Sequence, residues 1–144
     1  MSGIVYFDTS AVAKWYLNET RSEEVEKYLQ EHGPAAISDL TVVEMRCLLA
    51  RRRREKNIDP TLEMEIFAVF QEDIRQRHLV CHPLPSGLTA GALNMLPLLS
   101  EVPVRTLDLL HLMIAKEISA SILATADRTM AAGARALGLL VKQF

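Results

Sequence analysis

The 144-residue sequence has few cysteines, no excess of basic charge and no long apolar run, and each absence excludes a class of protein. Two cysteines, Cys47 and Cys81, are too few for a disulfide framework or a four-ligand zinc site. Sixteen basic and 18 acidic residues give a net charge of −2, which excludes a generally basic nucleic-acid binder but allows a local basic patch. The longest apolar stretch, residues 107–115, contains Asp108 and His111 and is too short to cross a bilayer.

Repeats, linkers and low-complexity tracts are also missing, so we expect one globular domain over residues 1–144. Neither glycine-rich phosphate-binding motif, G-x-x-x-x-G-K-[ST] or G-x-G-x-x-G, occurs. The first residues lack the basic-then-apolar pattern of a signal peptide. Both cysteines lie in apolar segments, where we expect buried, reduced thiols. The predicted compartment is therefore the cytoplasm, without membrane contact.

Short apolar runs alternate with helical patterns along the chain. Continuous apolar strands separated by helices indicate a parallel sheet that is covered on both faces. The predicted architecture is thus a three-layer α/β fold with about five short strands flanked by helices. The predicted strands are residues 4–7, 35–38, 79–82, 121–124 and 139–141. The predicted helices are residues 11–17, 23–32, 41–54, 60–77, 86–96, 107–118 and 127–137, with a capping box at residues 20–23 and a terminating glycine at position 138.

Four acidic residues follow predicted strands or begin predicted helices. Asp8 follows the first strand, Glu44 lies in the first turns of the helix after the second, Asp127 follows the fourth, and Asp108 lies in the first turn of a helix that Thr106 caps. The carboxyl ends of parallel strands form the binding edge of an α/β sheet, so we expect these carboxylates to meet there. Their mutual repulsion requires either raised pKa values or a divalent cation, and oxygen-only ligands suit Mg²⁺ or Mn²⁺ rather than zinc.

Each of three acids also has a purely structural interpretation. Asp127 could be only an N-cap, Glu44 could complete a capping box with Thr41, and Asp108 could be a first-turn acid favoured by the helix dipole. Asp8 has no such explanation, because it ends a buried strand.

Four segments, in order and spread over essentially the whole chain, resemble the motifs of the PIN domain family. They are residues 4–11 (IVYFDTSA), 41–44 (TVVE), 105–112 (RTLDLLHL) and 123–128 (LATADR). The size is similar to that of VapC, the toxin of VapBC toxin–antitoxin modules.

This resemblance implies a metal-dependent endoribonuclease that hydrolyses RNA phosphodiester bonds as the toxin of such a module. It implies that Asp8, Glu44, Asp108 and Asp127 are catalytic and hold one or two Mg²⁺ or Mn²⁺ ions, with Asp8 and Asp108 as the central ligands. It also implies a homodimer, and an antitoxin that masks the site.

Two hydroxyl residues near the acids have supporting roles in this interpretation. Ser10 could orient a carboxylate or a substrate phosphate, although an N-cap role also fits it, and Thr125 could act similarly. His111 follows Asp108 by one turn, so it either contacts the site or is a partly buried helix histidine.

Two further features have both a structural and a functional interpretation. The run Arg51, Arg52, Arg53 and Arg54 either contacts RNA phosphates or is a solvated helix end, since consecutive residues point all round a helix. Trp15 and the apolar side of residues 62–70 either belong to the core or form a partner surface. In VapC-like proteins the region equivalent to Trp15 helps form a groove for the antitoxin.

Two other functions stay open. A phosphatase of the haloacid dehalogenase type also has an aspartate after its first strand, but it needs a second aspartate where Ser10 stands. A non-catalytic, PIN-like interaction module is the other alternative, and the presence of all four acids disfavours it.

Overall fold

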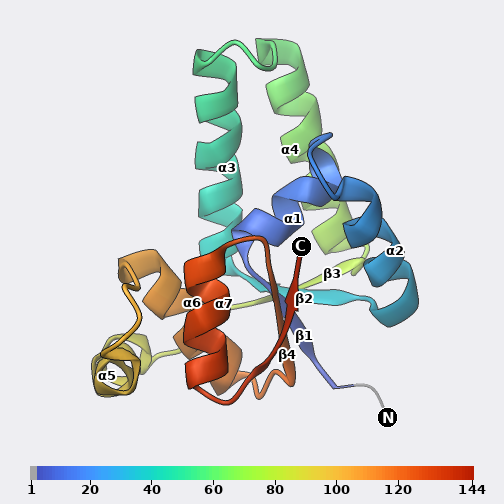
Figure 1. Cartoon of the computed structure of the whole chain (residues 1–144). Coiled ribbons are helices and arrows are strands. Elements are labelled where there is room, and N and C mark those ends of the chain that lie inside the picture. The colour runs from blue at the N-terminus through green and yellow to red at the C-terminus, as the bar shows by residue number, and fades with distance from the viewer. Residues whose placement is uncertain (1–2) are drawn as a thin grey trace.

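A computed structural model describes residues 3–144 and contains one five-stranded sheet in the order β3-β2-β1-β4-β5 (Figure 1). All neighbouring strands are parallel, which confirms the predicted fold class. Every strand lies within two residues of its predicted position; Met1 and Ser2 lie outside the described residues. The strands are β1 (Val5–Phe7), β2 (Ala35–Ser38), β3 (Leu79–His82), β4 (Ile122–Thr125) and β5 (Leu140–Gln143).

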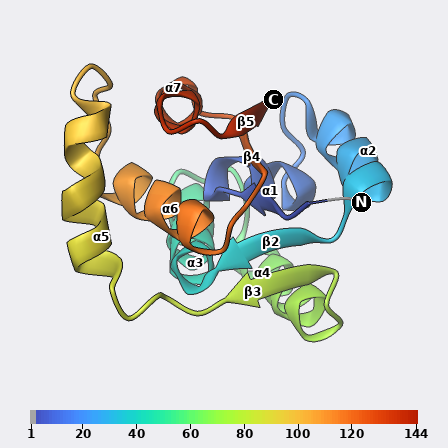
Figure 2. The ribbon, with the colours of Figure 1, turned by 90° about the horizontal axis from the view of Figure 1, so that it is seen from below.

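Helices cover both faces of this sheet, and Figure 2 shows α5 and α6 on the side opposite to α2. The alternation along central strand β1 separates two cores: Val5 and Phe7 pack with the first, and Tyr6 with the second. None of the described helices is long and apolar enough to cross a membrane. The helices are α1 (Thr9–Tyr16), α2 (Ser22–His32), α3 (Asp39–Arg54), α4 (Pro60–Arg75), α5 (Leu88–Met95), the 3₁₀ helix η1 (Leu96–Leu99), α6 (Thr106–Glu117) and α7 (Arg128–Ala136).

The start of α2 differs from the expected capping box at residues 20–23. Arg21 precedes the helix in the left-handed region with φ of 68°, and no side chain caps the helix. This backbone turn takes the place of an extended N-cap residue, so Thr20 is not in the capping position. Ser22 instead donates to the carbonyl of Leu17 at 2.9 Å and accepts from the backbone of Glu19. The predicted end of the helix at Gly33 is confirmed.

Helix α3 begins at Asp39, two residues before the predicted start. The hydroxyl of Thr41 accepts from the backbone N–H of Ser38 at 3.4 Å, so Thr41 reaches back to the N-cap. The structural interpretation of Glu44 as the capping-box acid is therefore wrong. Its carboxylate is left for contacts elsewhere.

Helices α3 and α4 project from the sheet as a hairpin (Figure 1). The buried carboxylate of Glu63 on α4 accepts from Arg46 at 2.8 Å and from Arg53 at 2.6 Å, both on α3. These two bonds join the two helices of the hairpin, which also pack through Met45 and Phe70 in the first core.

The expectation of two buried thiols is wrong for Cys47, which lies on an exposed face of α3. Cys81 is partly buried, and its thiol donates to Asp39 at 3.4 Å. Burial and this neighbouring carboxylate raise the pKa of Cys81 to about 12. Both thiols are unpaired.

Candidate acidic site

Three of the four predicted acids line one open pocket of about 880 Å³. Glu44 comes from the second turn of α3, Asp108 from the first turn of α6, and Asp127 from the residue before α7. The helices that follow β2 and β4 thus bring residues at or near their N-terminal ends to the carboxyl edge of the sheet, as expected for a parallel α/β fold. The remaining lining residues are Arg51, Pro103, Arg105, Thr106, Leu107 and Thr129.

The fourth acid, Asp8, lies buried beside this pocket and is linked to it through Thr125. The hydroxyl of Ser10 donates to Oδ1 of Asp8 at 2.7 Å, and that of Thr125 donates to Oδ2 at 2.5 Å. The oxygen of Thr125 also accepts from the backbone N–H of Asp127 at 2.9 Å. Burial raises the pKa of Asp8, although these hydroxyl donors act against it.

Two expectations about the start of α1 need correction. Asp8 does have a helical role, because its Oδ1 accepts from the backbone N–H of Ala11 and it is the N-cap of α1. Ser10 is accordingly not the N-cap, since it lies inside the first turn of the helix. The structure instead places the hydroxyls of Ser10 and Thr125 where they orient the Asp8 carboxylate; their part in catalysis stays a prediction.

Glu44 is held by two hydrogen bonds to the same oxygen. The hydroxyl of Thr9 donates to Oε1 at 2.8 Å, and Nε2 of His111 forms a short hydrogen bond with the same atom. Burial acts to raise the pKa of Glu44, but the hydrogen bond and charge of His111, together with Thr9, hold it below its usual range. Within residues 3–144 no hydrogen bond is formed by Oε2.

Asp108 and Asp127 line the pocket and also serve their own helices. Oδ2 of Asp108 accepts from the backbone N–H of Arg105 at 3.1 Å. Oδ1 of Asp127 accepts from the backbone N–H groups of Thr129 at 2.8 Å and Met130 at 3.2 Å. The structural interpretation of both acids therefore holds, and it is compatible with a second role in the pocket.

A buried polar chain behind Glu44 adds a residue that sequence reasoning did not identify, Tyr6. His111 is 2% exposed and its Nδ1 lies 2.7 Å from the Tyr6 hydroxyl. The same hydroxyl lies 3.0 Å from the hydroxyl of Ser38, and burial raises the pKa of Tyr6. A tyrosine in an otherwise apolar buried strand needs a polar partner, and this was the available signal.

The donor chemistry of the site fits a hard divalent cation, because all four acids offer carboxylate oxygens. In the described part of the chain, however, no group of three or more histidine, cysteine, aspartate or glutamate side chains lies close enough to form a ready metal site. The structure thus brings the acids to one edge of the sheet without gathering them into a closed ligand cluster. Each instead accepts hydrogen bonds from its own surroundings.

The arginine run is divided among different surroundings, as helical geometry requires. Arg51 lines the acidic pocket and lies 3.7 Å from Glu55. Arg52 is 3.4 Å from Glu19, Arg53 bonds to Glu63, and Arg54 is exposed outside the pocket lining. A second pocket arginine, Arg105, was not singled out from the sequence.

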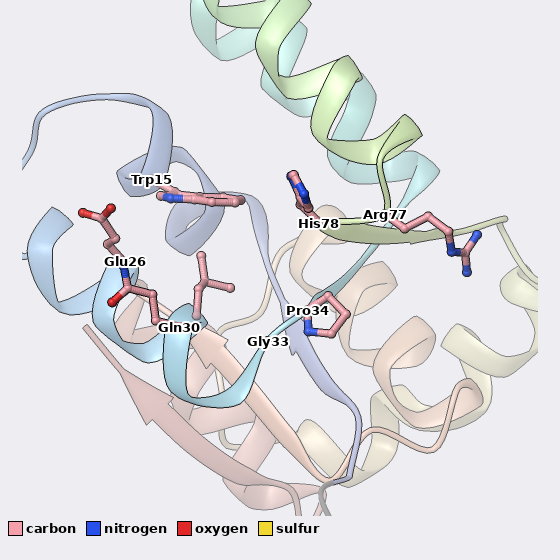
Figure 3. Close-up of a pocket in the computed structure, with 8 residues that line it drawn as sticks. Trp15, Glu26, Gln30, Gly33, Pro34, Arg77 and His78 are labelled. Atoms are coloured by element: carbon pink, nitrogen blue, oxygen red, sulfur yellow. The ribbon is translucent and has the colours of Figure 1, made fainter.

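Trp15 separates two hollows that lie away from the acids. The first has a volume of about 380 Å³, and Figure 3 shows the Trp15 indole facing it from α1, with Glu26 and Gln30 on α2 and His78 beyond α4. The second, about 410 Å³, lies between α1 and the apolar side of α4. Its lining residues are Trp15, Tyr16, Leu62, Glu65, Ile66, Val69 and Asp73.

The apolar residues of α4 divide between the core and the surface. Phe70 is fully buried and belongs to the core. Leu62 and Val69 are 40% and 54% exposed, so they form surface that water reaches. Tyr16 donates to Asp73 at 2.6 Å at the edge of the second hollow.

Comparison with known proteins finds a family model and several solved structures. The model of the PIN domain matches residues 5–136. A VapC20 toxin from Mycobacterium tuberculosis that cleaves the sarcin–ricin loop has 16% identity and a TM-score of 0.69, over 89% of this chain and 93% of that chain. VapBC2 from Rickettsia felis, bound to a promoter DNA fragment, has 14% identity and a TM-score of 0.70, over 98% of each chain. FitAcB from Neisseria gonorrhoeae has 17% identity and a TM-score of 0.71, over 96% of each chain. No curated protein matches the sequence.

Proposed function

Because the chain belongs to the PIN domain family, we propose that it is an endoribonuclease that acts as the toxin of a VapBC-type toxin–antitoxin module. The observation that carries this proposal is the pocket lined by Glu44, Asp108 and Asp127, with buried Asp8 linked to it through Thr125. The similar solved structures include an RNA-cleaving toxin and toxin–antitoxin complexes, which supports the same function.

The four acids are proposed to hold one or two Mg²⁺ or Mn²⁺ ions. Such a cation, when bound, supplies positive charge for the scissile phosphate and favours ionisation of the attacking water. The protein's own contribution is the placement of the carboxylates: the hydroxyls of Ser10 and Thr125 orient Asp8, and backbone N–H groups fix Asp108 and Asp127. The raised pKa of Asp8 is consistent with a carboxylate whose ionisation a nearby cation would favour.

RNA binding is assigned to the arginines that lie on the pocket itself. An acidic pocket repels a phosphate backbone, so positive charge must lie beside it. Arg51 and Arg105 line the pocket, whereas Arg52 and Arg53 are paired with carboxylates away from it. The proposal for the arginine run therefore narrows to Arg51, with Arg105 added.

The antitoxin is proposed to bind at the hollows on the two sides of Trp15. They present apolar side chains next to charged ones, which suits an amphipathic protein segment. A homodimer stays a prediction from the family resemblance, and measurement of the mass in solution tests it. The two free thiols agree with the reducing cytoplasm as the expected compartment.

The decisive experiment is cleavage of an end-labelled structured RNA by the purified protein with Mn²⁺, with Mg²⁺ and with EDTA. Asp8→Asn is the site variant, and Asp59→Asn, which changes an N-cap on α4 outside the pocket, is its matched control. We expect metal-dependent cleavage by the wild type and by the control, and none by Asp8→Asn. Undiminished cleavage by Asp8→Asn contradicts the assignment of the site.

The arginine assignment is tested by the salt dependence of RNA binding to cleavage-deficient protein. Removing one phosphate contact lowers the slope of log affinity against log salt by about 1. We expect this change for Arg51→Ala and no change for Arg54→Ala, which lies three residues further along the same helix. Equal slopes for both variants contradict an RNA contact at Arg51.

A non-catalytic interaction module is the second candidate, and one observation favours it: in residues 3–144 no three acids form a ready metal site. This alternative predicts a folded protein that neither binds Mn²⁺ nor cleaves any of the RNAs tested.

A further inference from the structure

A line of buried polar side chains runs from β1 to the acidic pocket. The Tyr6 hydroxyl is 2.7 Å from Nδ1 of His111 and 3.0 Å from the Ser38 hydroxyl, and Nε2 of His111 contacts Oε1 of Glu44. Tyr6 is fully buried and His111 nearly so. A polar chain of this kind is costly to bury unless every member has a partner.

The direction of the last hydrogen bond follows from the chemistry of its two groups. Oε1 of Glu44 already accepts from the Thr9 hydroxyl at 2.8 Å, as an ionised carboxylate does, and such a carboxylate can only accept. Nε2 of His111 must therefore carry a hydrogen and donate it. The other ring nitrogen is held by Tyr6, so the imidazole is anchored at both ends.

The two donors on Glu44 share one of its oxygens. His111 and Thr9 both bond to Oε1, and within the described residues Oε2 forms no hydrogen bond. Because Glu44 lines the acidic pocket, this arrangement fixes the carboxylate through one oxygen and leaves the other for a ligand there.

We propose that His111 is a positioning residue that holds the Glu44 carboxylate so that Oε2 faces the acidic pocket, with Tyr6 fixing the imidazole ring. The proposal rests on the function proposed above. His111 also joins α6 to α3, so it keeps the helix that carries Asp108 in register with the helix that carries Glu44. A histidine with only a packing role would have no such effect on Glu44.

The first experiment is a ¹⁵N NMR spectrum of the histidine side chains at pH 8, without RNA. The signals of His111 are assigned by their loss in His111→Gln. We expect a protonated Nε2 in the wild-type protein, as donation to Glu44 requires. An Nε2 without a hydrogen overturns the proposal, whether or not the protein cleaves RNA.

The second experiment compares His111→Leu and His111→Gln with Leu112→Ala, a control that destabilises the neighbouring core position without touching Glu44. Loss of a residue that orients a ligand typically lowers metal affinity or activity by about 10–100-fold. We expect this loss in Mn²⁺ affinity, measured by calorimetry, and in kcat for His111→Leu. His111→Gln should recover part of both, because its amide can donate to Glu44. Leu112→Ala should keep both near the wild-type values.

The outcomes separate this proposal from the proposed function. Equal losses for His111→Leu and Leu112→Ala, each measured well below its melting temperature, overturn the positioning role. Failure of the wild type to cleave RNA contradicts the ribonuclease but leaves the NMR and Mn²⁺ results decisive for His111. Failure of the wild type to bind Mn²⁺ overturns both.

Discussion

Asp127 has two roles that substitution can separate, since it caps α7 and lines the acidic pocket. Its Oδ1 accepts from the backbone N–H groups of Thr129 and Met130, at 2.8 and 3.2 Å. Asp127→Asn keeps an acceptor in this position and removes the negative charge. Asp127→Ala removes both. The two variants should therefore differ in stability and agree in the loss of activity.

The expected magnitudes follow from these contacts. Loss of an N-cap acceptor costs about 1 kcal/mol, within a range of roughly 0.5–2 kcal/mol, and loss of the charge at the helix N-terminus costs about 0.3–1 kcal/mol. Asp127→Asn should lose only the second amount, and Asp127→Ala both. With an m-value of about 2 kcal/mol/M, the urea midpoint should fall by about 0.5–1.5 M for Asp127→Ala and by at most about 0.5 M for Asp127→Asn.

Urea unfolding followed by far-ultraviolet circular dichroism measures the stability, and cleavage of labelled RNA with Mn²⁺ measures the activity. Asp59 is a matched control, because it caps α4 by accepting from Leu62 at 2.7 Å outside the acidic pocket. Asp59→Asn and Asp59→Ala should reproduce the pattern of stability and leave cleavage unchanged. Wild-type cleavage by Asp127→Asn would refute the reasoning, since the residue would then be only a helix cap.

Three further predictions concern stability. Asp8→Asn should raise the urea midpoint at pH 7, because burial raises the pKa of Asp8 and the folded state holds its ionised form at a cost. This cost is present above the raised pKa and is lost as the pH falls through it towards the ordinary pKa of 3.8, so the difference in urea midpoint should change over that range; a constant difference contradicts the argument. Glu63→Gln should lower the melting temperature, since two arginines lose their buried carboxylate, whereas exposed Glu65→Gln should not. Gly138→Ala should cost about 1–2 kcal/mol in urea unfolding, because φ is +81° and the backbone there is left-handed; an unchanged urea midpoint contradicts the argument.

The order of strands and helices could be predicted because each β-strand is a short apolar run between helical patterns. The strand β2 (Ala35–Ser38) lies where the sequence predicts it, and Gly138 ends the last helix at the expected left-handed position. The helix starts were harder, because capping depends on the backbone conformation of single residues. Arg21 shows this: its left-handed φ replaces the capping box that the sequence suggests.

The pocket could be predicted only in part, for a related reason. A parallel sheet brings residues after its strands to one edge, so spacing alone places Glu44 and Asp127 together. Their hydrogen-bond partners depend on contacts across the sheet, such as Glu44 with His111, which are 67 residues apart. Local patterns do not contain such pairings. Arg105 was missed for the same reason, because its place on the pocket depends on how α6 packs.

The structural roles and the proposed functional roles of these acids overlap at this edge for a physical reason. Helix N-termini carry unpaired N–H groups and a partial positive charge, so they stabilise carboxylates directly before and within the first turn. A parallel sheet collects several such termini at one edge. The carboxylates of Asp8, Asp108 and Asp127, which accept hydrogen bonds at the starts of their helices, therefore also lie at that edge. Capping leaves an oxygen of Asp108 and of Asp127 without a hydrogen bond in the described residues. The same interactions that begin the helices thus hold the remaining oxygens in place for the proposed chemistry, and substitutions that keep the cap while removing the charge separate the structural role from the proposed one.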